Sequence, residues 1–222
     1  VATQDPSLAV REIDRMAERP EMAAIVLSTA QPALLGQRQF HPIYEAAARH
    51  GLPVAIHVGN DGAGSTPPPT ASGYPTHFME YHVRASQSFL GHIISLVCEG
   101  VPAKFPTLKF AILGGGVSWI PHLMWRLDKN FKALRSTAPW LTRFPSEYIR
   151  DHFLFSTNPL EEAYVPAHML QLFEMFDAEN ALLYASDYPN AECDVQTDIL
   201  NRLSPEAQQK IYYDNAKKLY RL

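Results

Sequence analysis

The stretch Pro53-Val54-Ala55-Ile56-His57-Val58 decides the fold, because it is a short apolar run with a helical pattern directly before it. That helical pattern spans residues 38–50 and ends at Gly51, a residue suited to the left-handed conformation that terminates many helices. An apolar run without polar alternation indicates a strand buried on both faces. This helix-to-strand unit therefore predicts a parallel α/β protein.

The same alternation continues in both directions along the chain. Further apolar runs predict strands at 23–27, 108–113, 153–156 and 181–186, and residues 1–3 read as the end of another strand. Helices are expected at 5–18, 76–99, 146–151 and 161–176, from the glycines at 114–116 through Arg135, and from Ser204 to the end. No Gly-x-Gly-x-x-Gly follows the first strands, so the doubly wound dinucleotide-binding fold lacks its best local support. A closed (β/α)8 barrel needs eight strands, more than this chain supplies.

Composition excludes several classes of protein. Of the 222 residues 46% are hydrophobic and 19% are charged, which suits one large core and excludes a disordered chain. A formal net charge of −4 disfavours nucleic acid as a partner. No apolar stretch approaches the length of a membrane helix, so no membrane partner is expected. Two cysteines, Cys98 and Cys193, and the lack of a signal peptide predict a reducing, cytoplasmic location.

Candidate site residues follow the strands, because active sites of parallel α/β folds gather at the carboxyl ends of the strands. His57 and Asp187 each close a strand, and an imidazole with a carboxylate suits a zinc-type site. Each has an alternative: His57 could be a core histidine bonded to backbone, and Asp187 could cap the next segment. The expected substrate-binding side chains are those of Asn60, Trp119, Asn158 and Asn190, although Trp119 could equally be a core tryptophan.

Five motifs together resemble the amidohydrolase-related branch of the amidohydrolase superfamily. They are LPVAIHVG at 52–59, FPTLKFAILGGGVSWIPHLMWRLDKNF at 105–131, FSTNPLEE at 155–162, LLYASDYPN at 182–190 and DNAKKLYRL at 214–222. The resemblance covers nearly the whole chain and implies a single domain over 1–222 of the (β/α)8 TIM-barrel type. It further implies a mononuclear divalent metal, most often zinc, at the carboxyl ends of the strands. By the same resemblance His57 and Asp187 are metal ligands and catalytic residues, with Asp187 also transferring a proton.

Two functions fit this resemblance, and a third reading is not enzymatic. The first is a hydrolase that uses metal-activated water on a small carbonyl or carboxylate substrate. The second is a non-oxidative decarboxylase of an aromatic or muconate-like acid on the same scaffold. The third is a truncated, non-catalytic barrel that acts as a structural or binding module.

Two departures from the family pattern matter. No two histidines of this chain are two residues apart, so the family's His-x-His pair has no counterpart in it. We expect the family's first two strands to be missing together with that pair. Leu113 and Gly114 stand where many relatives carry histidine or glutamate. We therefore expect an incomplete barrel that binds metal weakly unless Glu80 or His82 completes the site, and whose open edges favour a homo-oligomer. The loop at 59–75, rich in glycine and proline, is expected to lie over the site as a mobile lid.

Overall fold

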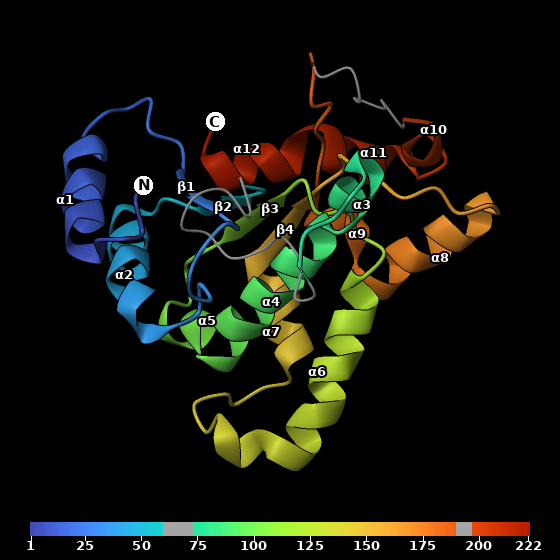
Figure 1. Cartoon of the computed structure of the whole chain (residues 1–222). Helices are drawn as coiled ribbons and strands as arrows, with labels where there is room; N and C mark the ends of the chain where they lie inside the picture. The colour runs from blue at the N-terminus through green and yellow to red at the C-terminus, as the bar shows by residue number, and fades with distance from the viewer. Residues whose placement is uncertain (60–72, 190–196) are drawn as a thin grey trace.

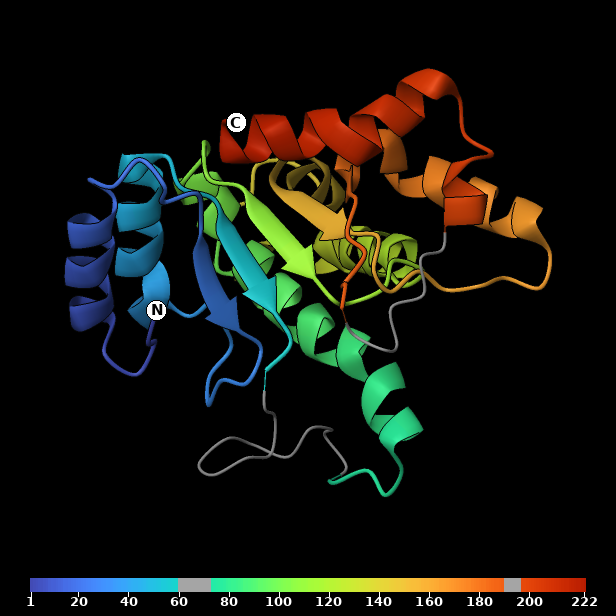
Figure 2. The same ribbon diagram turned by 90° about the horizontal axis from the view of Figure 1, so that it is seen from above.

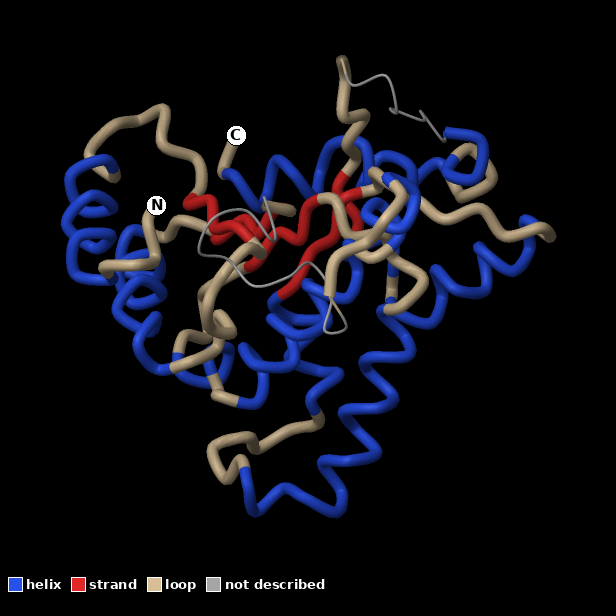
Figure 3. Tube along the Cα trace, in the orientation of Figure 1, coloured by secondary structure: helices blue, strands red, loops and turns tan. Residues whose placement is uncertain are grey.

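A computed structural model describes residues 1–59, 73–189 and 197–222. Its centre is a five-stranded parallel sheet in the order β1-β2-β3-β4-β5. Helices surround the strands, as the tube drawing makes plain (Figure 3). The strands are β1 (Ile25–Ser28), β2 (Val54–His57), β3 (Phe110–Leu113), β4 (Phe153–Ser156) and β5 (Leu182–Leu183). Every neighbouring pair is parallel, so the predicted parallel α/β architecture is confirmed.

The outer face of the sheet, defined by Ile56, Ile112 and Leu182, carries the main core. All three side chains are buried, because helices cover this face along its whole width. The helices that contribute are α1 (Pro6–Met16), α2 (His41–His50), α4 (Ala85–Cys98), α5 (Val101–Lys104), α6 (Ile120–Leu134), α7 (Pro145–His152), α8 (Pro166–Phe176) and α9 (Ala178–Ala181). Figure 1 shows α4, α5, α6 and α7 on one side of the strands.

The inner face, defined by Ala55, Ala111 and Leu183, is covered differently from our expectation. We expected every helix to lie outside the sheet, but α12 (Asn215–Tyr220) packs on the inner face through Leu219. Figure 1 shows α12 on the side of the strands opposite α4. The reason is the row of small and apolar inward side chains, which gains burial from Leu219. Val26, on the edge strand beyond this cover, stays 55% exposed.

Two predicted helices begin or divide differently from the sequence pattern. The helix expected over 76–99 is divided into α3 (Phe78–Val83) and α4, which meet at Arg84. The helix expected from residue 161 begins five residues later, because Val165 is extended and Pro166 occupies the first helical position. Three short helices, α5, α9 and α10 (Thr197–Leu200), lay outside the prediction. No helix in the described part of the chain is long and apolar enough to cross a membrane.

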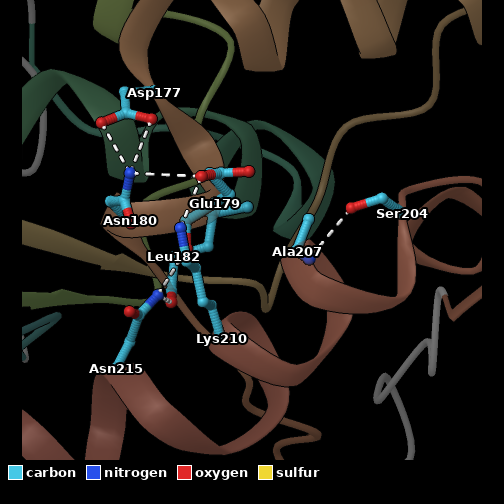
Figure 4. A network of polar contacts seen from close by, with 8 residues as sticks. All are labelled: Asp177, Glu179, Asn180, Leu182, Ser204, Ala207, Lys210 and Asn215. Atoms are coloured by element: carbon cyan, nitrogen blue, oxygen red, sulfur yellow. Dashed lines mark hydrogen bonds and ion pairs between the residues drawn. The ribbon is translucent and has the colours of Figure 1, made fainter.

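The C-terminal segment is helical, as predicted, and is tied to β5 by a polar network (Figure 4). It runs through α11 (Pro205–Gln209), a π-helical stretch (Lys210–Asp214) and α12. The amide of Asn215 donates hydrogen bonds to the carbonyl oxygens of Glu179 at 2.9 Å and Leu182 at 2.8 Å. The ammonium of Lys210 pairs with the Glu179 carboxylate at 2.6 Å. These contacts fix α12 beside the inner face.

Candidate active site at the carboxyl ends of the strands

The carboxyl ends of the strands meet at one edge of the sheet. Figure 2 shows the arrowheads of the blue, cyan, green and gold strands, β1 to β4, directed to the same side of the molecule. Ser28, His57 and Leu113 share one register position at this edge. Because parallel strands in register present matching faces, these three side chains point to the same side of the sheet. That side is the inner face, since Ala55 lies two residues before His57.

His57 ends β2 as an exposed side chain, so it is not the core histidine that the sequence left open as an alternative. It is the last residue of the strand and lies beyond the part of the inner face that α12 covers. Its Nδ1 atom lies 2.8 Å from the carbonyl oxygen of Val58. A carbonyl oxygen only accepts, so Nδ1 is the donor in this contact, and in the neutral form of the ring Nε2 keeps its lone pair. An imidazole held in this tautomer is the usual form of a metal-binding histidine.

Asp187 lies four residues beyond β5 and is exposed. Its backbone is left-handed, with φ of 58°, a conformation that aspartate tolerates better than most residues. The segment leading to it is anchored by Thr157, whose Oγ1 accepts the Ala185 N–H at 3.0 Å. In Figure 1 the orange segment that follows β5 rises on the side of the sheet that carries α12. His57 thus ends β2 and Asp187 follows β5, so both predicted ligands come after the carboxyl ends of strands of the same sheet.

Trp119 lies in the core rather than at the open edge. It is 8% exposed, and its indole N–H donates to the Gly115 carbonyl oxygen at 2.7 Å. Its ring meets Phe155 edge-on, with 5.9 Å between ring centroids. Phe155 belongs to the main core, so the structure does not bring Trp119 together with His57 and Asp187. The core alternative describes its surroundings.

Of the three asparagines predicted to bind substrate, Asn158 is among the described residues. Asn158 follows β4 at the carboxyl edge and is half-buried, and its carbonyl oxygen accepts a hydrogen bond from the Ser156 hydroxyl at 2.8 Å. Asn60 and Asn190 lie outside the described residues, as does most of the loop expected to act as a lid. At the start of that loop, Gly59 approaches β1 so closely that an added Cβ would lie 1.8 Å from the Ser28 hydroxyl oxygen.

Glu161 organises the loop after β3, and sequence reasoning did not single it out. Its carboxylate accepts the N–H of Val117 at 2.9 Å, the N–H of Ser118 at 3.1 Å and the Ser118 hydroxyl at 2.7 Å. Gly116 has φ of 68°, and an added Cβ would lie 2.5 Å from a Glu161 carboxylate oxygen. The glycine run thus folds into a concave set of donors filled by the chain's own carboxylate. A glycine run followed some forty residues later by Glu161 offers no sequence signal for this pairing.

His57 and Asp187 carry atoms that can bind a divalent metal. The lone pair on His57 Nε2 and the carboxylate of Asp187 are ligand types that zinc and manganese accept. In the described ranges, however, no group of three or more histidine, cysteine, aspartate or glutamate side chains could hold an ion. Glu80 and His82 are both exposed residues of α3, and the Glu80 carboxylate accepts the Thr76 N–H at 2.9 Å. The described residues therefore fit two positions of a metal site and leave the usual third protein ligand unfilled.

A family model described as Amidohydrolase matches residues 1–222. Solved structures with the same fold include an amidohydrolase from Mycobacterium avium subsp. paratuberculosis K-10, at 22% identity and a TM-score of 0.79. Another is 5-carboxyvanillate decarboxylase from Sphingomonas paucimobilis, at 23% identity and a TM-score of 0.71. A third is a dihydroxybenzoic acid decarboxylase from Polaromonas sp. JS666 with bound manganese and the inhibitor 2-nitroresorcinol, at 21% identity and a TM-score of 0.71. None of the curated protein sequences matches significantly.

The extent of these matches differs between the two sides. They cover 99%, 100% and 99% of this chain, but only 57%, 65% and 67% of the respective neighbours. The chain thus spans less than two thirds of the first two neighbours. At these identities the likeness shows the fold alone.

Proposed function

Because this chain belongs to the Amidohydrolase family, as the match over residues 1–222 shows, we propose that it is a metal-dependent hydrolase. The proposed reaction is hydrolysis of a small carbonyl or carboxylate substrate by metal-activated water. The observation that carries the proposal is the contact of His57 Nδ1 with the Val58 carbonyl oxygen at the end of β2, which leaves Nε2 as the nitrogen for a ligand bond. Family membership supports the reaction class.

The roles proposed for this chain's own residues follow from their chemistry. His57 would hold the ion through Nε2, with the Val58 carbonyl fixing its ring through Nδ1. Asp187 would share the ion and accept a proton from the attacking water, because a carboxylate can serve both as a metal ligand and as a general base. A divalent metal, when bound, supplies a Lewis acid and a water of lowered pKa. Asn158, at the same edge, and Asn60 and Asn190 are proposed to contact substrate.

The identity of the metal is part of the proposal. Zinc is the ion implied by the sequence resemblance, whereas the Polaromonas neighbour is described with bound manganese. An imidazole with a carboxylate suits either ion. We propose a divalent metal and take zinc as the first ion to test.

The proposal also includes a small-molecule substrate, self-association of the chain and a cytoplasmic location.

A second candidate function is non-oxidative decarboxylation of an aromatic acid. It is supported by two kinds of neighbour described as decarboxylases, one of 5-carboxyvanillate and one of dihydroxybenzoic acid. On this reading Asp187 would handle the proton that replaces the departing carbon dioxide. A third candidate, a non-catalytic module, is favoured by the lack of a three-ligand cluster among the described residues.

Product analysis separates the three candidates. The chain is supplied with zinc or manganese and offered one panel of esters and lactones and one panel of hydroxylated aromatic carboxylates. Hydrolysis that Asp187→Asn abolishes supports the first function, and release of carbon dioxide that the same variant abolishes supports the second. Asp198→Asn, a change on α10, is the control and should leave turnover unchanged. No turnover with either panel in the metal-loaded chain would favour the non-catalytic module.

A further inference from the structure

A cavity lies at the opposite end of the sheet from His57 and Asp187. It has a volume of about 690 Å³ and is lined near the starts of β2 and β3 by Pro53 and Leu108, and by the ends of α2 and α12. Five cationic side chains line it, with His50 and a single carboxylate, that of Asp151. The cationic side chains are those of Arg49, Lys109, Arg150, Lys218 and Arg221. Such a concentration is notable in a chain whose formal net charge is −4.

The acidic groups near this cavity already have partners. The Asp151 carboxylate pairs with Arg143 at 2.7 Å. Asp14, on α1, accepts Arg49 at 2.6 Å and the His50 ring nitrogen at 2.7 Å. Among the described residues, Arg49 is therefore the one cationic group lining the cavity that forms an ion pair with a carboxylate.

Three of the remaining cations are uncompensated. In the part of the chain that the structure describes, the side chains of Arg150, Lys218 and Arg221 form no hydrogen bond or ion pair. The ammonium group of Lys109 donates a hydrogen bond to the backbone carbonyl oxygen of Asp151, and not to the Asp151 carboxylate. Burial lowers the pKa of Lys109; the nearby charge of Asp151 raises this pKa, and the nearby charge of Lys218 lowers it. The chain thus holds like charges close together at this end of the sheet.

The geometry of the cavity suits a bound anion. The Arg221 guanidinium lies directly against Gly51, where an added Cβ would be 2.2 to 2.6 Å from its atoms. This close approach places the Arg221 guanidinium at the cavity wall. Leu154 and Leu219 supply apolar lining, and charge interactions strengthen where apolar surroundings reduce the local dielectric constant. A volume of this size falls in the range of small-molecule sites.

We propose that this cavity binds a small anion carrying several negative charges, of the polyphosphate or polycarboxylate class. Arg150, Lys218 and Arg221 would supply the charge-assisted hydrogen bonds, since they are the cations without partners in the described residues. The site is separate from the proposed metal site, because it lies at the amino ends of the strands. Its occupation would neutralise the repulsion between Lys109 and Lys218 and so stabilise the fold.

The test is calorimetric titration of the chain with pyrophosphate and, separately, with citrate, at constant ionic strength. Saturable binding of one or both is expected, with the stronger ligand identifying the phosphate or the carboxylate source. Arg150→Gln and Lys218→Gln should each weaken that binding about tenfold, the value of one charge-assisted hydrogen bond. Both side chains are exposed and form no hydrogen bond or ion pair with described residues, so both variants should fold. Thermal unfolding checks that they do.

Two variants serve as controls. Lys217→Gln removes the neighbouring charge on α12 that does not line the cavity, and it should leave the dissociation constant unchanged. His57→Ala should also leave anion binding unchanged, which separates this inference from the metal site. The inference is overturned if neither anion binds saturably, or if Lys217→Gln weakens binding as much as Lys218→Gln does, because the binding would then reflect general surface charge.

Discussion

The imidazole Nδ1 of His57 lies 2.8 Å from the carbonyl oxygen of Val58, the very next residue in the chain. This contact sets the tautomer of the ring without help from any distant side chain. It leaves Nε2 as an electron-pair donor at the end of β2, on the inner-face side of the sheet. A histidine so arranged can bind a metal ion through Nε2.

The first prediction concerns the tether of the C-terminal helix. Asn215→Ala removes two hydrogen bonds and leaves the Glu179 and Leu182 carbonyl oxygens without that donor. We expect a loss of roughly 1–3 kcal/mol in the free energy of unfolding, measured by urea denaturation. Lys210→Gln breaks only the exposed ion pair with Glu179 and should cost less than about 1 kcal/mol. Equal losses in the two variants would show that Asn215 has no special role.

The second prediction concerns the loop after β3. Glu161→Ala removes the acceptor shared by the Val117 and Ser118 N–H groups and the Ser118 hydroxyl. Hydrogen bonds to a charged group contribute about 1.5–3 kcal/mol, so we expect a loss of that order in the free energy of unfolding. The control is Glu174→Ala, an exposed change on α8. If Glu161→Ala unfolds at the same denaturant concentration as Glu174→Ala, the proposed organising role is wrong.

The third prediction concerns pH. Burial lowers the pKa of both His41 and His152, because the protonated ring loses hydration. Between the lowered pKa and the ordinary value near 6.5, the unfolded chain binds protons that the folded chain does not. The free energy of unfolding should therefore be fully retained above about pH 6.5 and fall as the pH drops below it.

Thermal unfolding from pH 8 to pH 5 measures this dependence. His152→Gln keeps a donor for the Leu108 carbonyl and removes the titrating group, so the decline toward pH 5 should become shallower. His168→Gln, a change at an exposed position on α8, should leave the slope as it is in the unmodified chain. A slope that His152→Gln does not alter would contradict the assignment to that ring.

Much of the sheet could be predicted from the sequence, because its signal is local. The run at 153–156 was predicted with the bounds that β4 has, and the other four strands fall within or one residue beyond the predicted runs. A strand buried among helices must be apolar throughout, so the pattern itself carries the information. Family membership was likewise predicted from motifs spread over the whole chain and is confirmed.

What could not be predicted depends on contacts between distant segments. The placement of α12 on the inner face follows from Leu219 meeting Ala55, Ala111 and Leu183, a match that no local pattern reveals. The late start of α8 leaves Glu161 outside the helix and free to reach Val117 across the loop. The exposure of His57 has the same origin, since it depends on how far α12 covers β2 rather than on the residues beside it.

The central claim, that His57 and Asp187 belong to one divalent-metal site, is tested most directly by titrating the chain with Mn²⁺ and following free Mn²⁺ by electron paramagnetic resonance. We predict one weak site per chain, because the described residues offer two ligands where a catalytic metal normally has three. His57→Ala and Asp187→Asn should each abolish that site. Two control variants, His77→Ala at an exposed position and Asp198→Asn on α10, should leave the site intact. Tight stoichiometric binding that survives both His57→Ala and Asp187→Asn would contradict the account and place the metal on other residues.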